Sequence, residues 1–116
     1  MRCVNYERWL MRRAKLSEMK GGWWIGEFEP SILKTGIFEV AVKEHKQYEL
    51  WPPHIQKEAT EYNLLISGHL QDRGQHFTSG DIWVIEPGET SMPAFFEDCV
   101  VVCVKVPSLP EDKVLV

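Results

Sequence analysis

The chain has 116 residues, of which 44% are apolar and 26% are charged, an ordinary composition for one globular domain. Its formal net charge of −4 argues against nucleic acid as a partner, because phosphate binding needs a concentrated basic surface. No apolar run approaches the roughly 20 residues that span a bilayer, and the first residues lack the apolar core of a secretory signal. We therefore expect a cytoplasmic protein without a nucleic-acid or membrane partner.

Residues 1–22 are expected to form a helical extension. Asn5 suits the N-cap position of a helix over residues 6–19, and Gly21-Gly22 would end that helix. The apolar residues of the stretch recur at helical spacing, namely Tyr6, Trp9, Leu10 and Leu16. The alternative is an extension that becomes ordered only against a partner subunit.

From Trp23 onward the pattern changes to short strands separated by turn signals. Glu86-Pro87-Gly88-Glu89 suits a type II turn, with proline at the second place and glycine at the third. A run of mostly apolar and β-branched residues, 99–106, is expected to lie centrally in a sheet. Many short strands at close spacing predict an all-β barrel or sandwich over residues 23–107, followed by a C-terminal tail over 108–116.

A polar segment in the middle of the chain carries the first recognisable motif. His54 and Gln56 are followed by Glu61 seven residues after the histidine, and Gly68 comes seven residues after Glu61. This spacing resembles the first motif of the cupin superfamily, H-x-H-x4-E-x6-G. In that motif the two histidines and the glutamate are metal ligands, so the resemblance places Gln56 where the second histidine stands.

The second motif follows at the expected distance. Gly80-Asp81 opens an apolar run and Pro87-Gly88 closes it, as in the second cupin motif, where a third histidine then follows. Ser91 stands in place of that histidine. The resemblance implies a cupin-type antiparallel β-barrel, also called a double-stranded β-helix or jelly roll, with a short N-terminal helix outside it.

The replacement of two metal-binding histidines by Gln56 and Ser91 affects whether the site can hold a metal cofactor. A complete cupin site offers three neutral imidazoles and one carboxylate to a divalent transition metal, and Gln56 and Ser91 remove two of the ligands that such ions prefer. We therefore expect no resident cofactor. The alternative is a divalent transition metal held by His54, Gln56 and Glu61, with water completing its coordination.

The same positions suit a small ligand. Residues alternate between the two faces of a strand, so Glu61 and Asn63 share a face, and the resemblance points that face into the barrel. Trp83 adds an apolar wall on which a sugar ring can stack, although a place in the core is an equally ordinary role for tryptophan. The expected ligand-binding residues are His54, Gln56, Glu61, Asn63, Trp83 and Ser91.

Three functions compete at this point. The preferred hypothesis is a small-molecule-binding cupin that recognises a carbohydrate or sugar nucleotide. The alternative is a metal-dependent cupin enzyme of isomerase or lyase type that uses His54 and Glu61. The third is a scaffold that uses the barrel only for dimerisation, and whether the protein is an enzyme stays open.

A homodimer is expected in each case. Small cupins commonly pair through sheet edges or exchanged N-terminal segments. The first 25 residues here carry four large apolar side chains in need of cover, namely Trp9, Leu10, Trp23 and Trp24.

Overall fold

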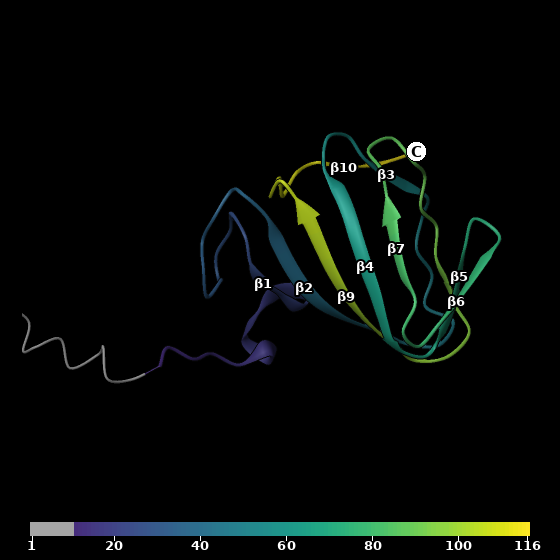
Figure 1. Cartoon of the computed structure of the whole chain (residues 1–116), viewed down its shortest axis with the longest axis horizontal. Helices are drawn as coiled ribbons and strands as arrows, with labels where there is room; N and C mark the ends of the chain where they lie inside the picture. Colours follow the sequence, from purple (N-terminus) through teal and green to yellow (C-terminus); the bar gives the residue numbers. More distant parts are fainter. Residues whose placement is uncertain (1–10) are drawn as a thin grey trace, which may run out of the picture.

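A computed structural model describes residues 11–116, which form an antiparallel all-β domain (Figure 1). The largest sheet has five strands in the order β1-β2-β9-β4-β7. Their bounds are β1 Trp23–Ile25, β2 Glu39–His45, β9 Cys99–Val106, β4 Thr60–Ser67 and β7 Ile82–Ile85. The apolar run over residues 99–106 therefore occupies the centre of the sheet, as its composition predicts.

Two smaller sheets form the layer that faces the five-stranded sheet. One pairs β10 (Lys113–Leu115) with β3 (His54–Gln56), and the other has the order β6-β5-β8, from Gln75–Thr78, His69–Asp72 and Ala94–Phe95. A bridge between His54 and Ser91 joins β3 to the segment that precedes β8, through backbone N–H···O distances of 3.0 and 2.8 Å. The layers enclose a core of Leu65, Leu70, Phe95, Cys99 and Val101. This is the expected cupin-type jelly roll.

The motif glycines occupy positions that other residues would strain. Gly68, between β4 and β5, has φ of +103°, and a Cβ atom there would lie 2.5 Å from the carbonyl oxygen of Asp98. Gly88 has φ of +85° in the turn closed by the Glu89 N–H and the Glu86 carbonyl oxygen, so the turn prediction is confirmed. Both motifs thus mark sharp changes of chain direction.

The described part of the N-terminal segment, from residue 11 onward, contains less helix than expected. Residues 6–10 of the expected helix lie outside the described residues, and residues 11–15 carry no regular structure. Two 3-10 turns follow, Leu16–Glu18 and Lys20–Gly22. Met11 is 94% exposed and Leu16 is 39% exposed, so neither side chain is buried in the described part of this segment, and burial is what stabilises a helix of this length. Among residues 11–116, no helix has the length and apolar character needed to cross a bilayer.

The segment expected as a C-terminal tail contains a strand. β10 runs antiparallel to β3, with Lys113 opposite Gln56 and Leu115 opposite His54. The buried carboxylate of Asp112 accepts backbone N–H bonds from Glu58 at 2.9 and 3.0 Å and from Ala59 at 2.9 Å. The side chain of Asp112 therefore anchors this segment to backbone that is distant in sequence, which the local pattern of so short a strand does not reveal.

Candidate functional site

A cavity of about 350 Å³ lies between the five-stranded sheet and the two small sheets. Every strand of the five-stranded sheet contributes to one wall, and β3, β5, β8 and β10 contribute to the other. This volume falls at the lower end of the range found for small-molecule sites, roughly 300–1,000 Å³. The cavity therefore accommodates a small organic molecule.

The structure brings five of the six expected ligand-binding residues to this cavity: His54, Gln56, Glu61, Asn63 and Trp83. The amide Nδ2 of Asn63 donates a hydrogen bond of 3.0 Å to the Glu61 carboxylate on the same strand. Trp83 lies directly across from Asn63 on β7 and stacks on Phe77, with ring centroids 4.3 Å apart. Trp83 thus belongs both to the cavity wall and to the edge of the core.

Ser91, the sixth expected residue, takes a different position. Its hydroxyl donates a 2.5 Å hydrogen bond to the buried carboxylate of Asp72, and it does not line the cavity. Asp72 also accepts the backbone N–H of Met92 at 3.0 Å. Ser91 therefore supports the wall through its backbone bridge to His54 instead of offering its hydroxyl to a ligand. The sequence pattern did not single out Asp72, which lies on a different strand.

The two residues of β3 are buried and differ in how they are satisfied. Nδ1 of His54, a residue 8% exposed, lies 3.2 Å from the Pro52 carbonyl oxygen, which suits donation from the Nδ1–H tautomer. Gln56 is 3% exposed, and its amide Nε2 has no hydrogen-bond partner among the described residues. A buried donor without an acceptor destabilises a fold by about 1–3 kcal/mol. Gln56 therefore lacks an acceptor that a ligand oxygen can supply.

These donors do not fit a cupin metal centre. Among residues 11–116 there is no group of three or more His, Cys, Asp or Glu side chains arranged to hold an ion. The Ser91 hydroxyl is engaged by Asp72, and the Gln56 amide presents an unmet N–H donor. Lys43, Lys105 and Lys113 line the same cavity, and their charges oppose a cation there. We derive no metal-dependent step.

The sequence pattern missed these three lysines. Their ammonium groups gather around two tryptophans of the cavity wall, Trp23 and Trp51. The Lys43 ammonium lies 5.6 Å from the Trp23 ring centroid and 5.8 Å from that of Trp51. Lys105 lies 4.9 Å from the Trp23 centroid, and Lys113 lies 4.4 Å from the Trp51 centroid. The only signal in the sequence was period-two alternation, which puts Glu39, Ala41, Lys43 and His45 on one face of β2.

Burial shifts the pKa values of charged residues in and beside this cluster. Desolvation lowers the pKa of Lys43 below the usual 10.5. The pKa of Lys113 is lowered first by desolvation and then by the nearby charges of Lys105 and Lys43. Burial raises the pKa of Glu39 above its usual 4.5, although the charge of Lys105 opposes that shift. The cavity therefore concentrates positive charge in a place where water screens it poorly.

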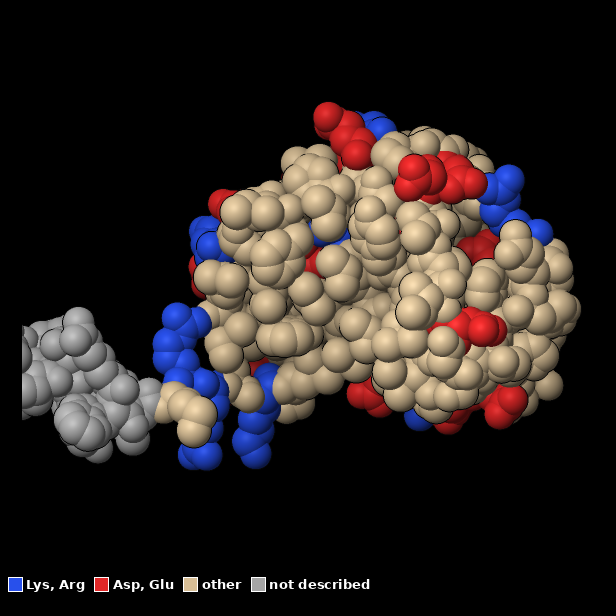
Figure 2. Space-filling view, in the orientation of Figure 1, with Lys and Arg blue, Asp and Glu red and all other residues tan. Residues whose placement is uncertain are grey.

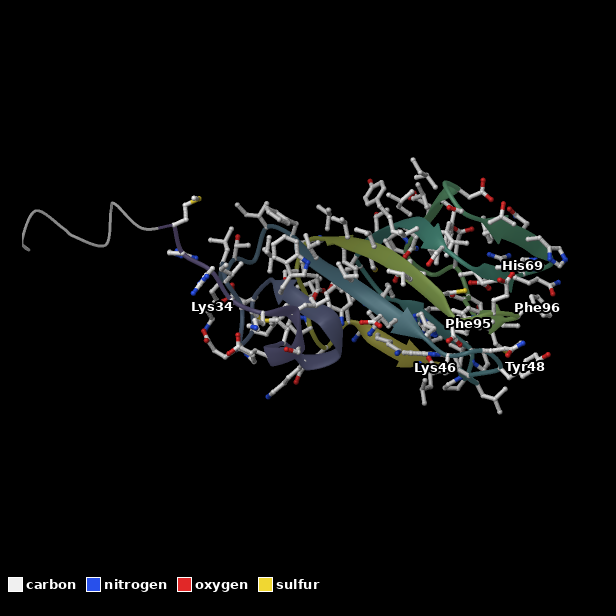
Figure 3. The ribbon with its side chains drawn as sticks, turned by 90° about the horizontal axis from the view of Figure 1, so that it is seen from below. Lys34, Lys46, Tyr48, His69, Phe95 and Phe96 are labelled. Atoms are coloured by element: carbon white, nitrogen blue, oxygen red, sulfur yellow. The ribbon has the colours of Figure 1, made fainter. Side chains whose placement is uncertain are left out.

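A short hydrogen-bonded cluster fixes the end of the cavity near β8. The Glu49 carboxylate lies 2.6 Å from Nδ1 of His45 and accepts the Trp51 indole N–H at 2.5 Å. Burial alone raises the pKa of Glu49, but these hydrogen bonds outweigh it and lower the pKa overall. His45 stacks on Phe95, with ring centroids 4.2 Å apart. The next residue, Phe96, lies outside the cavity and contacts the ring of His69. Figure 3 labels Phe95, Phe96 and His69. Glu49 thus orients two groups of the wall, His45 and Trp51.

No protein-family model and no curated protein sequence matches the chain. Its fold does match solved structures. A conserved protein with a double-stranded β-helix domain from Klebsiella pneumoniae has a TM-score of 0.64 at 19% identity, and the match covers 90% of this chain and 96% of that one. An RmlC-like cupin protein from Ralstonia eutropha has a TM-score of 0.56 at 10% identity, over 71% of this chain and 57% of that one.

A third match is the bacterial pirin YhhW from Escherichia coli, solved in complex with nickel(II). Its TM-score is 0.61 at 15% identity, over 75% of this chain and 39% of that one. At such identities the likeness establishes the fold and leaves the ligand and reaction to the site itself. With two facing antiparallel layers and both motif turns in place, the described chain has the fold of a small cupin domain, a double-stranded β-helix.

Proposed function

We propose that the protein binds a small organic molecule in the barrel cavity, with a carbohydrate or sugar nucleotide as the ligand class. The observation that carries this proposal is the composition of the cavity wall. It combines aromatic faces such as that of Trp83 with buried hydrogen-bonding groups on His54, Gln56 and Asn63 and with the half-buried carboxylate of Glu61. Sites for small molecules pair a largely apolar lining with a few placed polar groups in this way.

Binding is tested by calorimetric titration of the protein with neutral sugars, sugar acids, sugar phosphates and sugar nucleotides. Gln56→Leu keeps the side-chain size and removes the unmet donor, so we expect unchanged or higher stability together with about tenfold weaker binding. Gln75→Leu, an exposed position on β6, is the matched control and should bind like the wild type. Saturable binding that Gln56→Leu leaves unchanged would contradict the cavity as the site.

The competing function is a metal-dependent enzyme that uses His54 and Glu61. The nickel-bound pirin has a related fold that holds a metal, but the donors within residues 11–116 form no group of three or more His, Cys, Asp or Glu side chains. We therefore expect the purified protein to hold well under one transition-metal ion per chain. Elemental analysis of protein prepared without an affinity metal provides the measurement. One tightly held ion per chain would favour the enzyme.

We also propose that the protein is a homodimer joined through the outer face of the five-stranded sheet. Side chains such as Tyr62 (44% exposed), Ile82 (72%) and Val84 (47%) leave much apolar surface on that face. On the side of the molecule where β9, β4 and β7 face the viewer, charged residues lie mostly at the margins (Figure 2). A largely apolar face suits a second copy of itself, because a two-fold interface brings the same patch from each chain together.

A further inference from the structure

We propose that the cavity recognises an anionic group, a carboxylate or a phosphate, on its ligand, through Lys43, Lys105, Lys113 and the amide of Gln56. This inference rests on the proposed binding function and names the chemical class of the ligand. It starts from three lysines that the two cupin motifs do not include.

The four donors come together from four strands. Lys113 on β10 lies directly opposite Gln56 on β3, so both side chains stand on the cavity side of that small sheet. Lys43 on β2 and Lys105 on β9 belong to the inner face of the five-stranded sheet. The ammonium of Lys43 lies near both tryptophans, Lys105 near Trp23 and Lys113 near Trp51, as the distances above show. The two indole rings therefore connect the three ammonium groups into one cluster.

Each donor lacks an acceptor in the described protein. Within residues 11–116, none of the three ammonium groups forms an ion pair or hydrogen bond with a carboxylate, and the amide nitrogen of Gln56 is unpaired. Cation–π contacts with the two indole rings stabilise the ammonium groups only weakly and supply no hydrogen-bond acceptor. The lowered pKa values of Lys43 and Lys113 show that burial and like charges are not fully offset. An oxyanion would supply acceptors to all four groups at once.

Two carboxylates of the cavity lie opposite one of the three lysines in the cross-strand register. Lys105 lies between Glu39 on β2 and Glu61 on β4 in the cross-strand register. Glu61 also accepts the Asn63 amide, and Glu39 is only 4% exposed with its pKa raised by burial. These acids therefore offset the charge of Lys105 in part. Lys43 and Lys113, which gather at Trp51, have less compensation and should contribute most to anion binding.

The test compares matched ligands by isothermal titration calorimetry. Glucuronate and glucose 1-phosphate are the anionic probes for the carboxylate and the phosphate, and glucose and glucuronamide are the neutral probes. At least one anionic probe should bind about tenfold more tightly than both neutral probes, with an affinity that falls as salt is added. The stronger of the two anionic probes identifies which group the cluster prefers.

Substitutions of individual lysines test whether the preference for anionic probes comes from the cluster of Lys43, Lys105 and Lys113. Lys43→Gln and Lys113→Gln should each remove most of the anionic preference, whereas Lys46→Gln should keep it. The Lys46→Gln substitution removes the same charge outside the cavity. The Lys46 side chain is 85% exposed and lies at the surface near Tyr48 (Figure 3). Because Lys113 lies on a short edge strand whose three residues are all exposed, Lys113→Gln should stay folded even if Lys43→Gln does not.

The outcomes separate this inference from the proposed function. Equal binding of charged and neutral probes would overturn the anionic site and leave small-molecule binding in place. Anionic preference that persists in both cavity variants would also overturn it. Failure of every sugar, charged or neutral, to bind the folded wild-type protein would contradict both proposals.

Discussion

The five-stranded sheet carries ionisable side chains on its inner face and mainly apolar side chains on its outer face, which is the reverse of the usual arrangement in a globular protein. The inner face, which meets the cavity, carries ionisable side chains from three adjacent strands, including Glu39, Lys43, Lys105 and Glu61. The outer face has mainly apolar residues at the alternate positions, namely Val40, Val42, Tyr62, Leu64, Ile82, Val84, Val100, Val102 and Val104. A sheet that faces only water on its outside is normally polar there.

This difference assigns a separate role to each face. Charged groups are retained inside a fold when something compensates them, and a ligand in the cavity would do so for the lysines. Apolar residues are retained on an outer face when something covers them, and a second copy of the chain would do so here. Between the two faces, the packed core at the β5 and β8 end of the barrel supplies the stability that lets the cavity end stay polar.

Placing a charge on the outer face is expected to have the largest effect. Val102 lies between Val42 and Leu64 at the centre of that face, so Val102→Lys would bury a lysine from each chain in a two-fold interface. An unpaired buried charge costs about 3–5 kcal/mol, enough to weaken the dimer by at least about 100-fold. Light scattering should then report one chain in place of two.

Leu50→Lys is the control for that change, because Leu50 is 92% exposed in the loop before β3 and lies outside the outer face. It should leave the dimer intact. A wild-type protein that is monomeric at high micromolar concentration would instead rule out the outer face as an interface.

Substitutions at two neighbouring residues of β4 compare how much each face of the sheet contributes to the stability of the fold. Leu65→Ala should lower the free energy of unfolding by about 2–5 kcal/mol, because Leu65 is fully buried in the core. Ile66 points the other way and is 47% exposed, so Ile66→Ala should cost less than about 1 kcal/mol. Urea unfolding of both variants in the Val102→Lys background removes the contribution of the interface. Equal losses would mean that the faces do not differ in packing.

The inner face also depends on the segment that carries Lys113. Asp112→Asn keeps the side-chain size but turns an N–H group toward a backbone N–H of Glu58 or Ala59, so we expect a loss of about 1–3 kcal/mol. Anion binding should weaken as well, because Lys113 follows directly. Glu111→Gln, at the exposed neighbouring position, should change neither. Wild-type stability of Asp112→Asn would show that β10 is held by other contacts.

The smallest effect concerns pH. An anion prefers protonated ammonium groups, so the complex binds more protons than the free protein and anion affinity falls as pH rises. The lowered pKa values of Lys43 and Lys113 move this fall below the usual lysine value of 10.5. The neighbouring Lys105 and Glu61 act on both groups, and Cys103 and Glu49 act on Lys43.

Calorimetry from neutral to alkaline pH should show affinity for the anionic probe falling by up to about tenfold per pH unit above the lowered pKa. Lys43→Gln should flatten the profile, and Lys46→Gln should preserve it. A profile that is level up to the usual lysine pKa would contradict the contribution of these two groups.

Local chemistry explains why the sequence predicted the fold. Gly68 and Gly88 adopt backbone conformations that other residues rarely tolerate, so their spacing marks where the chain must turn. Strand alternation then predicted that Glu61 and Asn63 share a face, and the structure places both at the cavity. These features depend on residues close together in the chain, and a single sequence records them directly.

The positions of other residues were decided only in the tertiary structure. Ser91 follows the second motif, yet its hydroxyl bonds to Asp72, which lies 19 residues away in the chain. Lys43, Lys105 and Lys113 form one cluster only because the cross-strand register and the packing of the two layers bring β2, β9 and β10 together. Turns and alternation are properties of a segment, whereas the meeting of separate segments depends on the global minimum of the free energy. The sequence by itself therefore determined the barrel and part of the cavity wall, and the tertiary structure decided that the three lysines join that wall and that Ser91 does not.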